Sequence, residues 1–321
     1  MKPLTIGLLG ASGIAQRSVI DPAHRRDDVR VTAVAGRKDP SAYAAEHKIP
    51  TAYTGYDALL SDDSIDLVYV ALPPSEHARW TIAALEAGKD VLCEKPITMN
   101  AAEAIAVRDA AERTGHRVIE AFHDYYHPLQ GWLREFVESG QLGTITEVTA
   151  EFNATNTFDP ASLRHDPALG GGALMDLGCY PVHWVRSLFG EPTSTVATAE
   201  LNPLGADRST EATLTFAGGI TCHLRTNAGE DATFQSFIHI TGSAGTVHVE
   251  NMVFPSAGHS IEIDRQGLSF VSTVAGDTTY DHQLSAVIDS LRAGTTLPTE
   301  GGDYVNNMKV IDGIYTAAGV R

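Results

Sequence analysis

The sequence predicts an α/β protein with a parallel sheet in its first half and a large, mostly antiparallel open sheet in its second half. Two observations support this fold class. Up to residue 122, short apolar runs alternate with helical patterns, which is typical of parallel strands joined by right-handed crossovers. From Gln141 onward, strand patterns follow one another with glycine turns between them. A length of 321 residues favours two domains, which we expect at residues 1–121 and 122–321.

Composition and charge narrow the classes of function. Hydrophobic residues make up 43% of the chain and charged residues 20%, as in ordinary globular proteins. The formal net charge of −17 argues against a nucleic acid partner. The first residues lead straight into a strand and no segment reaches membrane-spanning length, so we expect a cytoplasmic protein without a membrane partner. Three cysteines without a CxxC pair predict neither a disulfide framework nor a bound metal.

The first strand pattern, Leu4–Leu9, leads into a glycine turn and then a helical pattern. In this context Gly10 makes the tight turn, and the small residues after it let a pyrophosphate approach the backbone at a helix N-terminus. The usual middle glycine is Ser12, so the motif is a variant of the dinucleotide fingerprint. The flanking strand and helix favour a nucleotide site over a plain turn. The residues predicted to contact the cofactor here are Gly10, Ser12, Gly13, Ile14 and Ala15.

The tip of the second strand indicates which dinucleotide binds. The strand at Val29–Ala35 ends at Gly36-Arg37-Lys38, where an NAD enzyme usually carries an acid for the ribose 2′-hydroxyl. Arg37 and Lys38 instead favour a 2′-phosphate. We therefore predict NADP as the cofactor, with NAD as an alternative. The pair could also be an ordinary solvated basic pair.

A third strand pattern, Ile65–Ala71, is almost entirely apolar and stops at two prolines. Ser75 is expected to cap the helix that follows. His77 then lies in the first helical turn, where the alternatives are a cofactor contact and an ordinary surface histidine. Leu72, Pro73 and His77 are the predicted cofactor contacts of this loop.

The next strand pattern, Val91–Cys93, follows the helix Ser75–Gly88 and ends in Glu94-Lys95-Pro96. Ligands of open parallel sheets bind at the carboxyl ends of the strands, so Lys95 is expected at the rim beside cofactor and substrate. The alternative is an exposed Glu-Lys pair before a turn proline. A helix at Ala101–Thr114 and a strand at Arg117–Phe122 complete this half.

The second half contains six strand patterns and two hairpin turns. The turns are Ala217–Gly219 and Gly242–Gly245. Two helices, Asp281–Arg292 and Gly302–Ala318, close the chain. The expected strands are Thr144–Phe152, Ser194–Leu201, Thr210–Phe216, Ile220–Asn227, Phe234–Gly242 and Thr246–Glu250.

A glycine run beginning at Gly170 precedes a helix expected over Gly172–Phe189. Asp176, Tyr180 and His183 fall at i, i+4 and i+7 and therefore share one face. Pro181 is expected to kink or interrupt the helix, which makes the shared face approximate. The alternative is a buried helix whose Tyr and His are satisfied by packing, and for His183 alone packing is favoured.

These segments together resemble the glucose-fructose oxidoreductase/inositol dehydrogenase (Gfo/Idh/MocA) family over essentially the whole chain. The combination of Glu94-Lys95-Pro96 with the glycine run before Asp176 and Tyr180 is specific. The resemblance implies an N-terminal Rossmann domain, a C-terminal α/β domain whose open sheet often forms dimer contacts, and hydride transfer at the cleft between them. The last helix, residues 302–320, is then expected to pack back on the N-terminal domain.

The resemblance also implies roles for individual residues. Lys95, Asp176 and Tyr180 are the expected catalytic residues, as in the tyrosine subgroup of the family. A nearby ammonium favours the ionised form of a tyrosine and so makes it a better base. Glu94 is expected to fix the cofactor or Lys95. The expected substrate contacts are His123, Arg164, Asp176 and His183.

The preferred function is an NADP-dependent oxidoreductase acting on a sugar or a related cyclic polyol or diol, of the aldose 1-dehydrogenase or ketosugar reductase type. Three alternatives stay open: a dinucleotide-binding sensor on the same fold, a dihydrodiol dehydrogenase, and a cofactor-dependent glycosidase. The presence of both Lys95 and Tyr180 speaks against the sensor, which has no need of a proton-transfer pair. The expected partners are a small-molecule substrate and further copies of the chain, as a dimer or tetramer through the C-terminal sheet.

Overall fold

The computed structural model describes residues 2–321, which form two compact units. The first unit comprises the chain up to Phe122 together with Tyr280–Val305, and the second comprises His123–Thr279 together with Asn306–Arg321. The boundary after Phe122 lies one residue from the expected one. The expected second domain was one continuous segment from 122 to 321, whereas residues 280–305 group with the first unit. Helix α10 (Gly302–Ala317) begins in the first unit and ends in the second.

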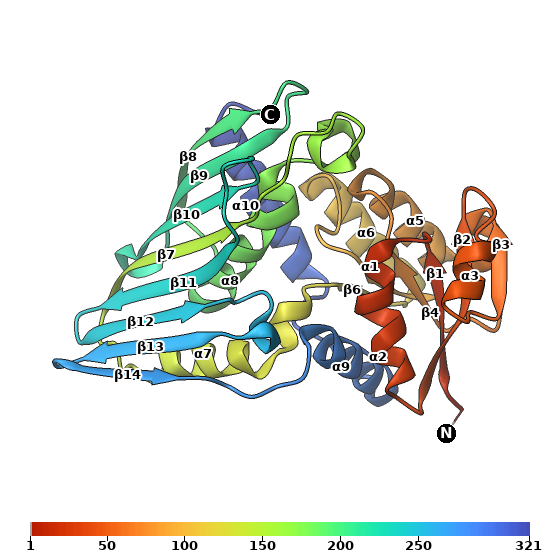
Figure 1. The fold of residues 1–321 in the computed structure, drawn as a ribbon, viewed down its shortest axis with the longest axis horizontal. Coiled ribbons are helices and arrows are strands. Elements are labelled where there is room, and N and C mark those ends of the chain that lie inside the picture. Colours follow the sequence, from red (N-terminus) through yellow and green to blue (C-terminus); the bar gives the residue numbers. More distant parts are fainter. Residues whose placement is uncertain (1) are drawn as a thin grey trace. The chain divides into compact units, whose positions relative to one another are not determined.

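Within the described residues, the first unit contains a parallel sheet of six strands in the order β3-β2-β1-β4-β5-β6 (Figure 1). The order reverses between β1 and β4, and in sheets of this kind ligands bind at the carboxyl ends of the strands beside that point. The predicted parallel sheet is confirmed, and the short edge strand β3 is an addition to it. The strands are β1 Leu4–Leu9, β2 Val29–Gly36, β3 Thr51–Thr54, β4 Leu67–Val70, β5 Asp90–Cys93 and β6 Val118–Glu120.

The helices of the first unit follow the predicted alternation, with one correction at α5 (Pro74–Glu86). Its N-cap is Pro73, and no side chain caps it, so the expected cap at Ser75 is wrong. Pro74 can occupy the first helical position because its missing N–H needs no partner there. The other helices are α1 Gly13–Ala15, α2 Asp21–His24, α3 Ser41–Glu46, α4 Tyr56–Leu60, α6 Ala101–Thr114 and α9 Thr279–Ala293.

Helix α9 joins the first unit through its apolar face. Leu284, Val287 and Ile288 are fully buried in one cluster with Ile6 and Leu8 of β1. Ion pairs add to this packing, among them Arg26–Asp289, Arg25–Asp281 and Arg117–Glu300. Helix α9, which comes late in the chain, therefore completes the core around the N-terminal sheet.

The second unit contains, among the described residues, a sheet of eight strands in the order β14-β13-β12-β11-β7-β10-β9-β8 (Figure 1). Neighbouring strands are antiparallel except β7 and β10, so the predicted mostly antiparallel sheet is confirmed. Helix α7 (Pro128–Glu138), β13 and β14 were not expected. The strands are β7 Ile145–Asn153, β8 Ser194–Leu201, β9 Asp207–Thr215, β10 Thr221–Asn227, β11 Gln235–Gly242, β12 Gly245–Glu250, β13 Ser260–Arg265 and β14 Leu268–Ser272.

The helix after the glycine run lies against β7 and β10 and is divided into two parts. A π-helical turn, Leu174–Gly178, precedes the α-helix α8, Cys179–Phe189. The expected interruption of the helix lies just before Pro181, which stands in the first turn of α8, directly after the π-helical turn. The irregularity is the wider turn that carries Asp176.

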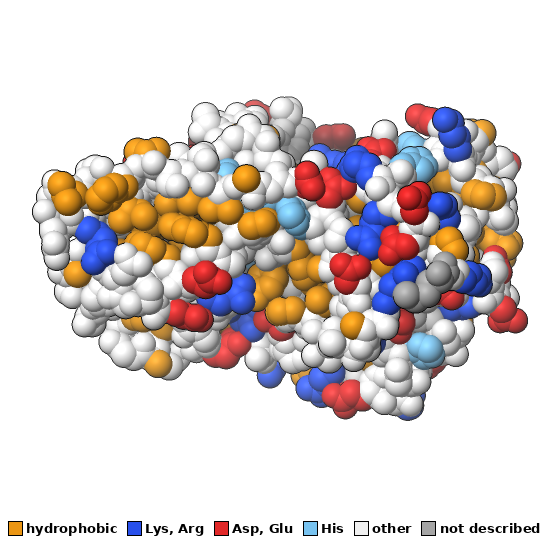
Figure 2. All heavy atoms as spheres, turned by 90° about the horizontal axis from the view of Figure 1, so that it is seen from below, with side chains coloured by type: hydrophobic (Ala, Val, Ile, Leu, Met, Phe, Trp, Pro, Cys, Tyr) orange, Lys and Arg blue, Asp and Glu red, His pale blue; other side chains and the backbone are white. Residues whose placement is uncertain are grey.

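Apolar side chains are exposed on the edge strands of this sheet. On β14 these are Leu268, Phe270 and Val271, of which Val271 is 74% exposed, and on β8 Val196 is 70% exposed. Figure 2 shows hydrophobic side chains gathered along the side of the molecule on which β14 lies. Exposed apolar patches of this kind often mark interaction sites. Among residues 2–321, no helix has the length and apolar character needed to cross a membrane.

Candidate active site

The glycine turn after β1 has the geometry of a phosphate-binding loop. Gly10 has a φ of 106°, and a Cβ there would lie 2.7 Å from the Ala71 carbonyl oxygen, so only glycine fits. A Cβ at Gly13 would meet nothing within 4 Å, which leaves the backbone open to a ligand. The Ser12 hydroxyl is buried and has no hydrogen-bond partner among the described residues. This donor and the open backbone fit a pyrophosphate, and its contact with these residues stays a prediction.

Arg37 and Lys38 are both exposed directly after β2. No ion pair or hydrogen bond of the Arg37 guanidinium is found within the described chain. A free guanidinium at the tip of β2 suits a 2′-phosphate, which it can bind through two parallel hydrogen bonds.

His77 holds together the two loops that follow β4 and β5. Its Nδ1 lies 2.9 Å from the Pro96 carbonyl oxygen, and its Nε2 lies 2.8 Å from that of Leu72. The side chain is buried, and this burial lowers the pKa of the imidazole. A neutral ring donates to one carbonyl at a time. His77 therefore links the loop after β4 to the loop after β5. Its predicted contact with the cofactor stays a prediction.

The loop after β5 is fixed by two buried carboxylates. Glu94 Oε1 accepts hydrogen bonds from the hydroxyls of Tyr69 and Ser18, and burial raises the pKa of the Glu94 carboxyl. Glu120 Oε1 accepts from the Ile97 N–H at 2.8 Å. These contacts hold the segment on either side of Lys95, which itself is partly exposed. No motif in the sequence pointed to this role of Glu120.

In the second unit Tyr180 and His123 form a buried pair. The Tyr180 hydroxyl lies 2.9 Å from His123 Nε2, and His123 Nδ1 lies 2.7 Å from Thr279 Oγ1. All three side chains are at most 3% exposed. Phe152 meets the Tyr180 ring edge-on, with the ring centroids 5.5 Å apart. The structure thus brings together two of the residues proposed from the sequence and adds Thr279, which the sequence did not indicate.

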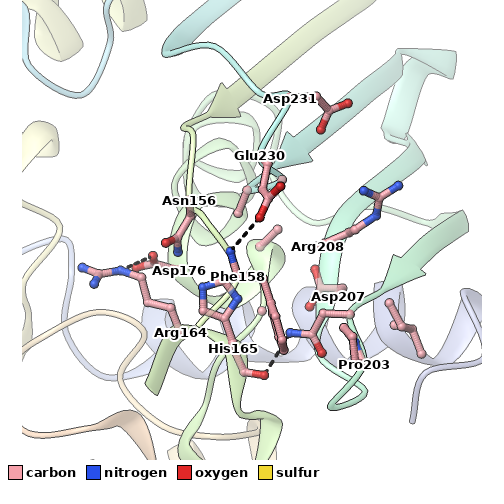
Figure 3. A pocket seen from close by; sticks show the side chains of 16 residues that line it. Asn156, Phe158, Arg164, His165, Asp176, Pro203, Asp207, Arg208, Glu230 and Asp231 are labelled. Atoms are coloured by element: carbon pink, nitrogen blue, oxygen red, sulfur yellow. Dashed lines mark hydrogen bonds and ion pairs between the residues drawn. The ribbon is translucent and has the colours of Figure 1, made fainter. Parts of the chain in front are cut away.

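Asp176 and Arg164 meet at the wall of a pocket of about 510 Å³ (Figure 3). Arg164 Nε donates to Asp176 Oδ2 at 2.9 Å, and both side chains are partly exposed. The rest of the lining is rich in hydrogen-bonding groups, including Asn156, Glu230 and Asp231. A lining of this kind suits a ligand with several hydroxyl groups.

Close packing explains the glycine run before Asp176. Gly172 has a φ of 127°, and a Cβ there would overlap Asp207 Oδ1. The buried Asp207 carboxylate accepts from the Leu174 N–H, the Thr210 hydroxyl and the Tyr315 hydroxyl at 2.7–2.8 Å. Asp207 therefore fixes the start of the helical segment that carries Asp176 and Tyr180.

Substituting Asp207 is expected to destabilise the protein. Asp207→Ala leaves three donors without their acceptor and should lower the free energy of unfolding by about 3 kcal/mol. Tyr315→Phe removes one donor and should lower the free energy of unfolding by about 1 kcal/mol. Urea denaturation measures both, with the exposed Asp231→Ala as the control. Equal stability of Asp207→Ala and the native protein would contradict this role.

His183, a predicted substrate contact, lies in a different environment from Asp176. It is 1% exposed, and its ring meets that of Tyr125 edge-on at 5.2 Å. Its neighbour Asp124 is fully buried and accepts from Trp184 Nε1 at 2.6 Å and Gln130 Nε2 at 3.1 Å. The π-helical turn shifts the register between Asp176 and Tyr180, whereas Tyr180 and His183 lie three residues apart in α8 and both contact the segment His123–Tyr126.

The buried Asp124 predicts a pH-dependent stability difference. Burial raises the pKa of this carboxyl from 3.8 to about 6, so its ionisation destabilises the fold as pH rises through this range. An asparagine cannot ionise. Relative to the native protein, the free energy of unfolding of Asp124→Asn should therefore rise by about 2 kcal/mol between pH 4 and pH 7. Thermal unfolding at these pH values, with exposed Asp27→Asn as control, checks this, and a difference independent of pH would contradict it.

Comparison with known proteins decides the family. Residues 4–122 match the oxidoreductase family with an NAD-binding Rossmann fold, and residues 132–248 match the GFO/IDH/MocA C-terminal domain. The chain belongs to the GFO/IDH/MocA oxidoreductase family. Membership confirms the predicted family, the predicted fold class and the prediction of an oxidoreductase.

Similar GFO/IDH/MocA proteins cover nearly the whole chain. D-xylose 1-dehydrogenase (NADP(+)) 2 of Haloferax volcanii is 34% identical over 318 residues, which are 98% of this chain and 97% of that protein. A dTDP-3,4-didehydro-2,6-dideoxy-alpha-D-glucose 3-reductase of Saccharopolyspora spinosa is 32% identical over 96% of this chain and 94% of its own length. The crystal structure of KijD10, a 3-ketoreductase from Actinomadura kijaniata in complex with NADP and TDP-benzene, has a TM-score of 0.89 at 25% identity and covers 98% of each chain.

Proposed function

We propose that the protein is an NADP-dependent oxidoreductase that transfers a hydride between the nicotinamide and a sugar, with Tyr180 and Lys95 handling the proton. The observation that carries the proposal is the buried Tyr180 hydroxyl, held by His123 on the helical segment whose Asp176 lines a polar pocket. Similarity to an NADP-dependent xylose dehydrogenase and to ketosugar reductases supports the sugar class and the cofactor. The reacting carbon and the preferred direction are left to experiment.

Residues of the first unit would hold the cofactor. The glycine turn would bind the pyrophosphate through backbone N–H groups and the Ser12 hydroxyl, and Arg37 with Lys38 would bind the 2′-phosphate. Leu72, Pro73 and the Glu94-Lys95 segment follow β4 and β5 at the same end of the sheet. When bound, the nicotinamide accepts or donates the hydride.

The protein supplies orientation and proton transfer. Asp176 and Arg164 would bind substrate hydroxyl groups in the pocket, and Tyr180 would take the proton of the reacting hydroxyl as the hydride leaves its carbon. The Lys95 ammonium would bind the same oxygen and favour the ionised tyrosine. This residue set supports an enzyme over a sensor, because a sensor needs no tyrosine and lysine for proton transfer.

Assaying turnover tests the proposal directly. Absorbance of reduced nicotinamide should change when NADP is mixed with members of a panel of aldoses, including D-xylose, cyclic polyols and diols. The best substrate should be a sugar. A preference for aromatic dihydrodiols would favour the dihydrodiol dehydrogenase alternative, and binding of NADP without turnover on any member would favour the sensor.

Cofactor choice should depend on Arg37. Arg37→Ala removes a charge-assisted contact with the 2′-phosphate, so the preference for NADP over NAD should fall by roughly 1–3 kcal/mol. The ratio of kcat/KM values for the two cofactors measures it. Arg30→Ala, at the other end of β2, is the matched control and should keep the native ratio. A native enzyme without preference for NADP would contradict the assignment.

We also propose that the protein forms homo-oligomers, dimers or tetramers, through the sheet of the second unit. The exposed apolar side chains of β14 and β8 support this. Light scattering after gel filtration measures the assembly, and a monomer at micromolar concentration would argue against it. Location in the cytoplasm stays a prediction from the sequence.

A further inference from the structure

A chain of two buried hydrogen bonds connects Tyr180 to Thr279 through the His123 ring. Both ring nitrogens are used, Nε2 toward the tyrosine hydroxyl and Nδ1 toward the threonine hydroxyl. Because a neutral imidazole carries one N–H, the two bonds are linked. When the Tyr180 hydroxyl donates to Nε2, Nδ1 carries the hydrogen and donates to Thr279 Oγ1. This arrangement leaves Nε2 as a proton acceptor directly beside the tyrosine.

The surroundings of His123 suit a ring that gains a positive charge. The Phe254 ring stacks on it, with centroids 5.6 Å apart and an interplanar angle of 22°. A cation above an aromatic face is stabilised by the negative charge of that face. The ionisable group that faces His123 from α8 is Tyr180, while Thr279 presents a hydroxyl. The adjacent Asp124 carboxylate accepts its hydrogen bonds from Trp184 and Gln130.

Tyrosine by itself is a poor base near neutral pH because its ordinary pKa is about 10. A histidine ionises at about 6.5 and can take a proton in the physiological range. A tyrosine that passes its own proton to a histidine need not be ionised before the substrate binds. The Lys95 ammonium of the proposed function then stabilises the negative charge that develops on the tyrosine oxygen during the transfer.

We propose that His123 is a positioning residue that accepts the Tyr180 proton during oxidation, a role that rests on Tyr180 being the base of the proposed function. As the substrate O–H bond breaks, its proton bonds to the Tyr180 oxygen, and the original Tyr180 proton bonds to His123 Nε2. The hydride leaves the same carbon for the nicotinamide, and the imidazolium donates from Nδ1 to Thr279 Oγ1. The extra proton is lost to water after product release, and in reduction the steps run in reverse.

The test compares His123→Gln with the native enzyme, using NADP and the best aldose of the panel. A glutamine oxygen can accept the Tyr180 hydrogen bond but cannot take its proton. We expect kcat for oxidation to fall by about 10- to 100-fold with KM little changed. The rising limb of the pH profile should move to higher pH by more than one unit, because the tyrosine then lacks the proton acceptor that the histidine provides.

Further variants separate this role from a structural one. Thr279→Val removes the partner of Nδ1 at nearly constant volume and should lower kcat, while Thr279→Ser should restore it. His127→Gln alters a buried histidine that caps α7 and should leave the pH limb in place. Substrate deuterated at the reacting carbon shows whether hydride transfer limits the rate.

Native kcat and an unmoved limb in His123→Gln, alongside an impaired Tyr180→Phe, would overturn the role of His123 alone. Near-native turnover in Tyr180→Phe would instead remove the proposed function on which it rests. Should His123→Gln fail to fold, the Thr279→Val and Thr279→Ser pair decides the matter. An unchanged pH limb and an unchanged kcat in Thr279→Val would then overturn the role.

Discussion

Tyr180→Phe is expected to lower kcat by about 10²- to 10⁴-fold, with the affinity for NADP little changed. The substitution keeps the ring, which packs against Phe152, and removes only the hydroxyl that meets His123. The loss is therefore chemical, because the proton of the reacting hydroxyl has no acceptor. Steady-state kinetics gives kcat, and quenching of tryptophan fluorescence by NADP gives the affinity.

Two further measurements on Tyr180→Phe distinguish a chemical role from a structural one. Thermal unfolding should show a folded protein, since only one buried hydrogen bond is lost, at a cost of about 1 kcal/mol. The native pH profile for oxidation should rise through an apparent pKa below that of free tyrosine, and the phenylalanine variant should lack this limb. A folded Tyr180→Phe enzyme with near-normal turnover would show that the tyrosine is structural.

Local patterns were sufficient to predict much of the first unit. The Leu4–Leu9 strand and the turn at Gly10 were correctly placed because a buried strand is continuously apolar and a positive φ requires glycine. Lys95 could be assigned to the end of β5 for the same reason. In contrast, β14 is exposed along its whole length, so it lacks the alternation of buried and exposed residues that identifies a strand.

Contacts between distant residues could not be predicted from local patterns. His123 and Tyr180 are 57 positions apart, and Leu174 and Asp207 are 33 apart, so no spacing rule pairs them. The helical pattern suggested one face for Asp176, Tyr180 and His183, but the π-helical turn changes that register. Similarly, the association of α9 with the first sheet depends on tertiary burial of residues such as Leu284.

Lys95→Met should impair turnover at least as strongly as Tyr180→Phe, by about 10²-fold or more. Methionine keeps an unbranched apolar stem and removes the ammonium, so the substrate oxygen and the ionised tyrosine lose their positive partner. The backbone around residue 95 should persist, because Glu120 still binds the Ile97 N–H and Glu94 still binds Tyr69. Lys309→Met, at an exposed lysine, serves as the control, and this variant should keep the native kcat.

The double variant Lys95→Met/Tyr180→Phe tests whether the two residues serve one proton transfer. Groups that act as a unit are strongly non-additive, since removing the second has little left to remove. We therefore expect the double variant to be about as impaired as the worse single variant, with an interaction energy well above the roughly 0.5 kcal/mol typical of independent sites. Single-turnover measurements at saturating NADP isolate the chemical step. If the losses of the two single variants multiply in the double variant, Lys95 and Tyr180 act independently and the shared acid-base role is lost.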